Sequence, residues 1–280
     1  MPFFKRAEIT FKEIPWIAST GVAKLTNPES IAFYRKVTSG GYEPEKNIIV
    51  LPRHKLIYVT VPKSASTRIR RTLARIEGRF SRSLRQSKRS KYRGPYGPRN
   101  ITIGSFHELA TDPASLRFSF VRNPYARIVS CWANKFALKP LVRAGDPFID
   151  AYLAARPEID LRLPEGATHS LSFADFVVFV TAAAEIHKDS HIQAQSDILS
   201  IPGLELNFIG KVESFNQDFA RVLDHLKASD DARGEASKAL NESHHFDWPT
   251  YYTPELADRI YRAYECDFDQ FVYSRAPSLR

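Results

Sequence analysis

The sequence predicts an α/β fold, because two apolar runs rich in β-branched and aromatic residues each lead through a polar turn into a helix. The runs are residues 56–61 and 116–121, and helix signals follow both turns. At 280 residues, with 43% hydrophobic and 25% charged residues, the chain is long enough and apolar enough to bury one sizeable core. We therefore expect a single α/β domain.

The N-terminal part differs from the rest of the chain. Residues 1–46 mix prolines, charges and aromatic residues without sustained periodicity, which predicts an irregular extension before a domain at 47–280. The apolar run 47–51 and the run 56–61 then form either a hairpin or a strand preceded by an extended segment. The N-terminus has no sustained apolar segment, and the most apolar stretch, 171–184, is interrupted by Asp175 and too short to span a bilayer. We therefore expect a cytoplasmic protein without a transmembrane segment, and peripheral membrane contact stays open.

The first strand–turn–helix unit carries a candidate anion site at its turn. Pro62 interrupts the strand, and apolar residues at helical spacing continue to Gly78, a candidate C-cap. The N–H groups that open the helix lie at the positive end of its dipole, and Lys63 adds a mobile ammonium group. Hydroxyl groups come from Ser64, Ser66 and Thr67. The loop lacks the G-x-x-x-x-G-K-[ST] spacing of nucleoside triphosphate sites, which counts against an ATPase or a GTPase.

The net charge and the cysteine content limit the classes of ligand and partner but do not select one. The net charge of +9 suits a nucleotide, a nucleic acid, an anionic glycan or a membrane surface. Cys131 and Cys266 are too few for a disulfide framework, and neither belongs to a C-x-x-C pair. The adjacent His244 and His245 lack further ligands at useful spacing, so no metal site is expected.

A basic loop is expected at residues 79–99, which are rich in arginine, lysine, serine, glycine and proline. Tyr92 and Tyr96 among the cations would suit single-stranded nucleic acid, but no nucleic-acid-binding module is recognisable. A solvated loop, or one that closes on an anionic acceptor, is favoured. In the second case Arg85 and Arg89 are candidate acceptor contacts.

The second strand–turn–helix unit places polar groups at the same kind of edge. Residues 101–106 are expected to form a strand that leads to His107 and Glu108. After the strand at 116–121, Asn123 is an N-cap with proline at the first helical position, so Arg122 lies at the carboxyl end of a strand and Ser130 lies two turns into a helix. Ligands of open α/β sheets bind at that edge.

These two units resemble the donor-binding motifs of sulfotransferases. The hexapeptide at 62–67 resembles the loop that binds the 5′-phosphosulfate of 3′-phosphoadenosine 5′-phosphosulfate (PAPS), and residues 118–130 resemble the motif that binds its 3′-phosphate. The polar segment 188–195 and residues 208–213 are similar to the carbohydrate branch of the family, the Golgi-type family 2 sulfotransferases. The R-K-G loop of small-molecule sulfotransferases is absent, as is the usual Golgi membrane anchor, so a soluble bacterial-type member is expected.

The resemblance, which spans roughly residues 55–273, implies a P-loop-like three-layer α/β/α fold with a central, mainly parallel sheet. It implies PAPS as the donor, adenosine 3′,5′-bisphosphate (PAP) as the product, no metal, and an acceptor hydroxyl on a carbohydrate, glycolipid or other glycoconjugate. The alternatives are a nucleotide-dependent phosphotransferase and a basic nucleic-acid-binding protein. The expected donor-binding residues are Pro62, Lys63, Ser64, Ala65, Ser66, Thr67, Arg68, Arg122 and Ser130.

In-line sulfuryl transfer requires a group that neutralises charge on the leaving phosphate and a base that takes the acceptor proton. The resemblance assigns the first role to Lys63. His107 is favoured as the base, because related enzymes carry a catalytic histidine in that region and histidine suits proton transfer near neutrality. Glu108 is a rival, and His191 in the polar segment is a third candidate on the acceptor side. Acceptor identity and oligomeric state stay open.

Overall fold

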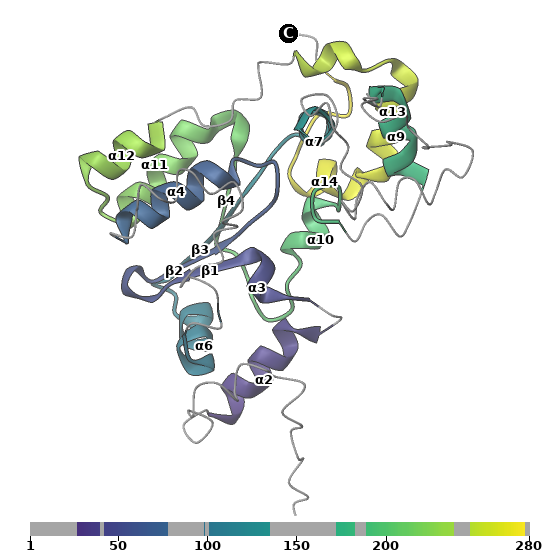
Figure 1. The fold of residues 1–280 in the computed structure, drawn as a ribbon. Coiled ribbons are helices and arrows are strands. Elements are labelled where there is room, and N and C mark those ends of the chain that lie inside the picture. Colours follow the sequence, from purple (N-terminus) through teal and green to yellow (C-terminus); the bar gives the residue numbers. More distant parts are fainter. Residues whose placement is uncertain are drawn as a thin grey trace, which may run out of the picture.

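The computed structural model describes residues 27–39, 42–77, 98, 101–134, 172–182, 189–237 and 247–277. Within these residues the chain forms a four-stranded sheet flanked by helices (Figure 1). The strands are β1 Ile48–Leu51, β2 Leu56–Val59, β3 Leu116–Val121 and β4 Phe208–Lys211, in the order β1-β2-β3-β4. The pairs β2–β3 and β3–β4 are parallel, which confirms the predicted α/β class with a mainly parallel sheet.

The first two strands form a hairpin, one of the two arrangements that the sequence left open. β1 pairs antiparallel with β2, with Ile48 opposite Val59. The short 3₁₀ helix Pro52–His54 connects them, and Lys55 closes the turn in the left-handed region with φ 47°. β1 is therefore an edge strand of the sheet, while β2 and β3 run in the same direction in its centre.

Helices account for most of the remaining described residues. The α-helices are α2 Pro28–Val37, α3 Pro44–Asn47, α4 Ser66–Ile76, α6 Ile103–Thr111, α7 Pro124–Trp132, α9 Phe173–Ala182, α10 Gln195–Leu199, α11 Phe215–His225, α12 Asp230–Ser237, α13 Pro254–Ala263 and α14 Glu265–Gln270. Two further 3₁₀ helices are η6 Val212–Ser214 and η7 Trp248–Tyr251. Among the described helices, none is both long and apolar enough to cross a membrane.

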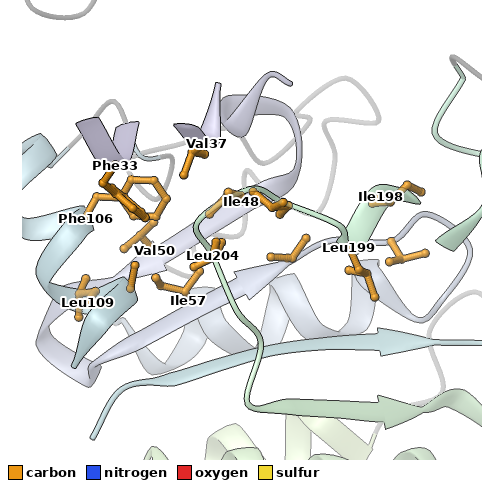
Figure 2. Packing of buried hydrophobic residues seen from close by; sticks show 14 of the residues in the cluster. Phe33, Val37, Ile48, Val50, Ile57, Phe106, Leu109, Ile198, Leu199 and Leu204 are labelled. Carbon is orange, nitrogen blue, oxygen red and sulfur yellow. The ribbon is translucent and has the colours of Figure 1, made fainter. Parts of the chain in front are cut away.

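Side chains alternate between the two faces of the sheet and bury a separate cluster on each. On one face, Leu56 and Tyr58 of β2 pack with helices α4, α11 and α12, and Tyr58 stacks on Phe118 of β3 at 4.8 Å between ring centroids. On the other face, Ile57 and Val59 pack with residues of α2, α6 and α10 (Figure 2). The sheet is thus the middle layer of three, as the expected α/β/α architecture requires.

A third buried cluster lies beyond the sheet. It joins α7 to α9, α13 and α14, with Tyr125, Phe176, Ile260 and Phe268 among its buried members. Tyr125 packs against Phe268 at 4.8 Å between ring centroids. This cluster fixes the helix that follows β3 and brings α14, from the C-terminal part of the chain, close to α10 (Figure 1).

Two predicted elements differ in the structure. The prediction of a strand at 101–106 is wrong, because the helix α6 begins at Ile103. Thr102, within the predicted strand, instead caps this helix, and its hydroxyl accepts from the Ser105 N–H at 3.0 Å. Phe106 and Leu109 are buried on one face of the helix. The extension predicted to be irregular contains α2, whose Phe33 joins the cluster that includes β1 and α6.

Candidate functional site

The turn between β2 and α4 has a strained backbone. Lys63 and Ala65 have φ values of 69° and 57°, in the left-handed region that residues other than glycine seldom adopt. Ala65 occupies the N-cap position of α4 and has no side chain that can accept from the first N–H groups of the helix. The turn therefore presents helix N–H groups beside a lysine, which is suitable for binding a phosphate group.

The hydroxyl groups of this loop point in different directions. Ser64 is completely buried, and its hydroxyl donates to Oε1 of Gln195 at 3.2 Å. Its side chain therefore supports the loop from inside. Ser66 and Thr67 lie in the first turn of α4, where Ser66 is half-buried and Thr67 is exposed. These two hydroxyls are the better placed of the predicted set for contact with a ligand.

Arg122 lies beside this loop, because both follow the carboxyl ends of neighbouring parallel strands. It follows β3 directly, and its Nη1 is 3.5 Å from the carbonyl oxygen of Lys63. Asn123 caps α7 by accepting from the Tyr125 N–H at 2.9 Å, and Ser130 is buried further along that helix. Burial lowers the pKa of Arg122, and the Glu213 carboxylate opposes that shift. An arginine stays cationic under these conditions, so the site keeps its positive charge.

Arg127 is a buried cation that the sequence analysis did not single out. Its guanidinium donates to the carbonyl oxygens of Pro62 at 3.2 Å, Gln193 at 2.8 Å and Ser190 at 2.8 Å. It thus ties α7 to the phosphate loop and to the polar segment before α10. No local signal marks this residue, because an arginine early in a helix is usually exposed to solvent.

Gln195, at the first position of α10, lies between the loop and Arg122. Its Oε1 accepts from the Arg122 N–H at 2.9 Å, and its Nε2 donates to the Arg122 carbonyl at 2.8 Å. The same Nε2 donates to the buried carboxylate of Asp267 on α14 at 3.2 Å. The two predicted donor motifs therefore share a buried amide contact.

A hollow of about 390 Å³ lies next to the first turn of α4 and is lined by Arg68 and residues 212–217. Arg68 contacts α11 and α12. Its guanidinium lies 4.2 Å from the Phe215 ring centroid, donates to Asn216 Oδ1 at 3.0 Å and also donates to the Ala236 carbonyl. This residue is thus a wall of the hollow, fixed against α11 and α12.

The first two candidate bases lie on α6. His107 Nδ1 is 3.1 Å from the Ser30 hydroxyl, and its ring stacks on Phe33 at 4.9 Å between centroids. Glu108 is exposed on the same helix. These contacts join His107 to α2 and give it no link to the phosphate loop. A catalytic role for either residue stays a prediction.

His191 lies in the polar segment before α10. The Asp189 carboxylate lies 2.7 Å from His191 Nδ1, and it accepts from the His191 backbone N–H at 2.8 Å. Arg127 holds the neighbouring Ser190 and also Pro62, the residue before Lys63. The structure therefore connects the His191 segment to the phosphate loop through one buried side chain.

Several predicted features lie outside the described residues. They include Arg85 and Arg89, almost all of the predicted basic loop at 79–99, and the pair His244 and His245.

Comparisons with known proteins agree with the two motifs. A model described as "Sulfotransferase family" matches residues 46–274. Carbohydrate sulfotransferase 12 of Mus musculus is 25% identical, with 83% of this chain and 61% of the relative covered. Carbohydrate sulfotransferase 14 of the same species is 24% identical, with 81% and 60% covered. Carbohydrate sulfotransferase 8 of Mus musculus is 26% identical, with 81% and 56% covered.

The chain spans about three fifths of the length of these curated relatives. No solved structure matches it significantly. The family match extends from just before β1 to just after α14, so it includes the sheet and both phosphate motifs. Because this match covers most of the chain, the protein belongs to the sulfotransferase family.

Proposed function

We propose that the protein transfers a sulfuryl group from PAPS to a hydroxyl group of a carbohydrate or glycoconjugate. The observation that carries the proposal is the meeting of the two phosphate motifs at one edge of the sheet, with Arg122 Nη1 at 3.5 Å from the Lys63 carbonyl. The carbohydrate acceptor is supported by the names of the relatives, which are carbohydrate sulfotransferases.

The residues at this edge fit a donor with two separate phosphate groups. The loop residues Lys63, Ser66 and Thr67, with the N–H groups of α4, would hold the 5′-phosphosulfate. Arg122 and Ser130 would hold the 3′-phosphate. PAPS supplies the activated sulfuryl group, whose transfer leaves a phosphate with additional negative charge. The Lys63 ammonium neutralises that charge, from a loop that leads directly into α4.

For the proton of the acceptor hydroxyl, the geometry favours His191 over His107. In the tautomer with a proton on Nδ1, His191 donates to Asp189 and leaves Nε2 available to accept a proton. Arg127 holds this segment next to the residue that precedes Lys63. The contacts of His107, by contrast, are with α2. We propose His191 as the general base, with His107 and Glu108 as the alternatives.

Calorimetry tests the donor class directly. The purified protein is titrated with adenosine 3′,5′-bisphosphate, ATP and an oligonucleotide, and the bisphosphate is expected to bind most tightly. Arg122→Ala should remove most of the preference for the bisphosphate, because a charge-assisted contact to the 3′-phosphate is lost. Tight binding of ATP without binding of the bisphosphate would sink the proposal. A screen of carbohydrate acceptors with radiolabelled PAPS then identifies the acceptor.

A further inference from the structure

The amide side chain of Gln195 uses all of its hydrogen-bonding positions. Oε1 accepts from the Arg122 N–H at 2.9 Å and from the Ser64 hydroxyl at 3.2 Å. Nε2 donates to the Arg122 carbonyl at 2.8 Å and to Asp267 Oδ2 at 3.2 Å. An amide has two acceptor positions and two donor positions, so this side chain is completely satisfied. Gln195 is also completely buried, and it cannot rotate without leaving buried groups unpaired.

Asp267 determines which way this amide points. Its carboxylate is completely buried and accepts from the backbone N–H groups of Gln195 at 2.9 Å and Ser196 at 2.7 Å. A carboxylate accepts only, so it must face Nε2 and not Oε1 of Gln195. The Arg122 N–H requires an acceptor and therefore faces Oε1. Asp267 thus fixes the backbone of α10 and the orientation of the amide together.

The partners of Gln195 belong to the two separate phosphate motifs. Ser64 lies between the strained residues Lys63 and Ala65, in the loop assigned to the 5′-phosphosulfate. Arg122 is the residue assigned to the 3′-phosphate. The amide bonds both backbone polar groups of Arg122, so it fixes the position from which the Arg122 side chain starts. One rigid group therefore sets the relative position of the two halves of the donor site.

We infer that Gln195, oriented by Asp267, is a positioning residue that holds the two phosphate-binding motifs at the spacing of a nucleotide with both a 3′- and a 5′-phosphate. This inference rests on the proposed function. A ligand that carries both groups at fixed spacing gains affinity only where both motifs are held in place beforehand. The residue therefore contributes selectivity for the doubly phosphorylated nucleotide, and it does so without touching that ligand.

The test compares two nucleotides in the full chain. Calorimetry gives the dissociation constants of adenosine 5′-monophosphate and adenosine 3′,5′-bisphosphate. The dissociation constant of the monophosphate divided by that of the bisphosphate measures the affinity gained from the 3′-phosphate. Gln195→Met keeps similar size but removes the four hydrogen bonds. We expect the ratio to fall about tenfold in this variant, because the two motifs are no longer held in place beforehand and the bisphosphate must order them when it binds. The affinity for the monophosphate should change much less.

The matched control is Gln193→Met, two residues away in the same segment. The backbone carbonyl of Gln193 accepts from Arg127, and that bond does not depend on the side chain. This variant should keep the wild-type ratio. If Gln195 acts only in folding, the Gln195→Met variant should have a lower melting temperature and a smaller binding-competent fraction, but an unchanged ratio. An unchanged ratio in folded Gln195→Met would overturn the inference while the proposed function stands.

Two further outcomes are decisive. If Gln195→Met does not fold, Ser64→Ala takes its place, because it removes one of the four bonds and keeps both to Arg122. It detaches the 5′-phosphate loop from the amide that fixes Arg122, so we expect the same ratio to fall by a smaller factor of about three. An unchanged ratio would again overturn the inference. Failure of the wild-type protein to bind the bisphosphate at all would overturn the proposed function, and this inference with it.

Discussion

Lys63 and Ala65 hold left-handed backbone angles on either side of Ser64. Such angles cost about 1–3 kcal/mol each in residues other than glycine, and they persist only where the surrounding structure imposes them. Contacts of two buried side chains do so here. Ser64 donates to Gln195, and the Pro62 carbonyl accepts from Arg127. The loop is therefore held in its binding shape by the protein itself, and the ligand does not have to supply that ordering energy.

The proposed general base gives the first prediction at this scale. His191→Gln should lower kcat by a factor of about 10² to 10⁴, the usual contribution of a positioned base. Asp189→Asn should give a smaller loss, because it removes the carboxylate that faces Nδ1. His107→Gln is the competing variant and should retain most of the turnover. Steady-state kinetics with saturating donor decides between them. A large loss in His107→Gln with normal turnover in His191→Gln would assign the base to α6.

At the scale of the elements, the fit of β4 against β3 depends on a glycine. A Cβ atom at Gly210 would lie 2.6 Å from two atoms of the Phe120 ring. That ring is buried and packs against Phe215 and Phe219 of α11, at 5.1 and 5.8 Å between centroids. Any side chain at position 210 therefore forces a core aromatic ring to move.

Gly210→Ala should lower the free energy of unfolding by about 1–3 kcal/mol, the usual cost of overpacking a core. Gly234→Ala is the matched control, because a Cβ there meets nothing within 4 Å and the residue lies inside α12. It should raise the free energy of unfolding by up to about 1 kcal/mol, since alanine favours a helix over glycine. Urea denaturation measures both. Equal effects of the two substitutions would show that the contact with Phe120 is unimportant.

Elements are predictable from sequence where their signals are contiguous. The loop at 62–67 and the unit around Arg122 each combine a strand, a turn and a helix signal within about a dozen residues, so both were located correctly. At the start of α6 a strand was predicted, because β-branched residues favour strands. The structure has a helix there, because the Thr102 cap outweighs that preference. Local preference is a weak guide when a cap and a buried face favour the other structure.

For the molecule as a whole, the site depends on pairs that are far apart in the sequence. Gln195 meets Ser64 across 131 positions and Asp267 across 72. The polar segment 188–195 marks the neighbourhood of Gln195 but not the role of its amide, and an acidic residue in a helix, such as Asp267, is ordinary. Their role follows from the tertiary fold, in which α14, from the cluster beyond the sheet, packs against α10 near the end of β3 (Figure 1).

The net charge of +9 gives the last prediction, at the scale of the whole molecule. The proposed donor contacts are in the phosphate loop, Arg122 and Ser130. We therefore expect the basic residues of the predicted loop at 79–99 to bind the acceptor. Their neutralisation should raise the KM for an anionic acceptor and weaken its salt dependence, because screening then has fewer charges on which to act. Donor affinity should stay nearly unchanged. The variant for this test replaces Arg82, Arg85, Lys88, Arg89 and Lys91 together with glutamine.

Acceptor kinetics at several salt concentrations, with bisphosphate calorimetry as the control, measure these effects in the five-site variant. If Coulomb attraction holds the acceptor, the lower KM of the wild type should rise with salt concentration. The KM values of the wild type and the variant should approach each other above about 0.5 M salt, where the Debye length falls to a few ångströms. Unchanged acceptor kinetics in a folded variant would mean that the loop is only solvated surface. A loss of bisphosphate affinity would instead show that the loop takes part in holding the donor.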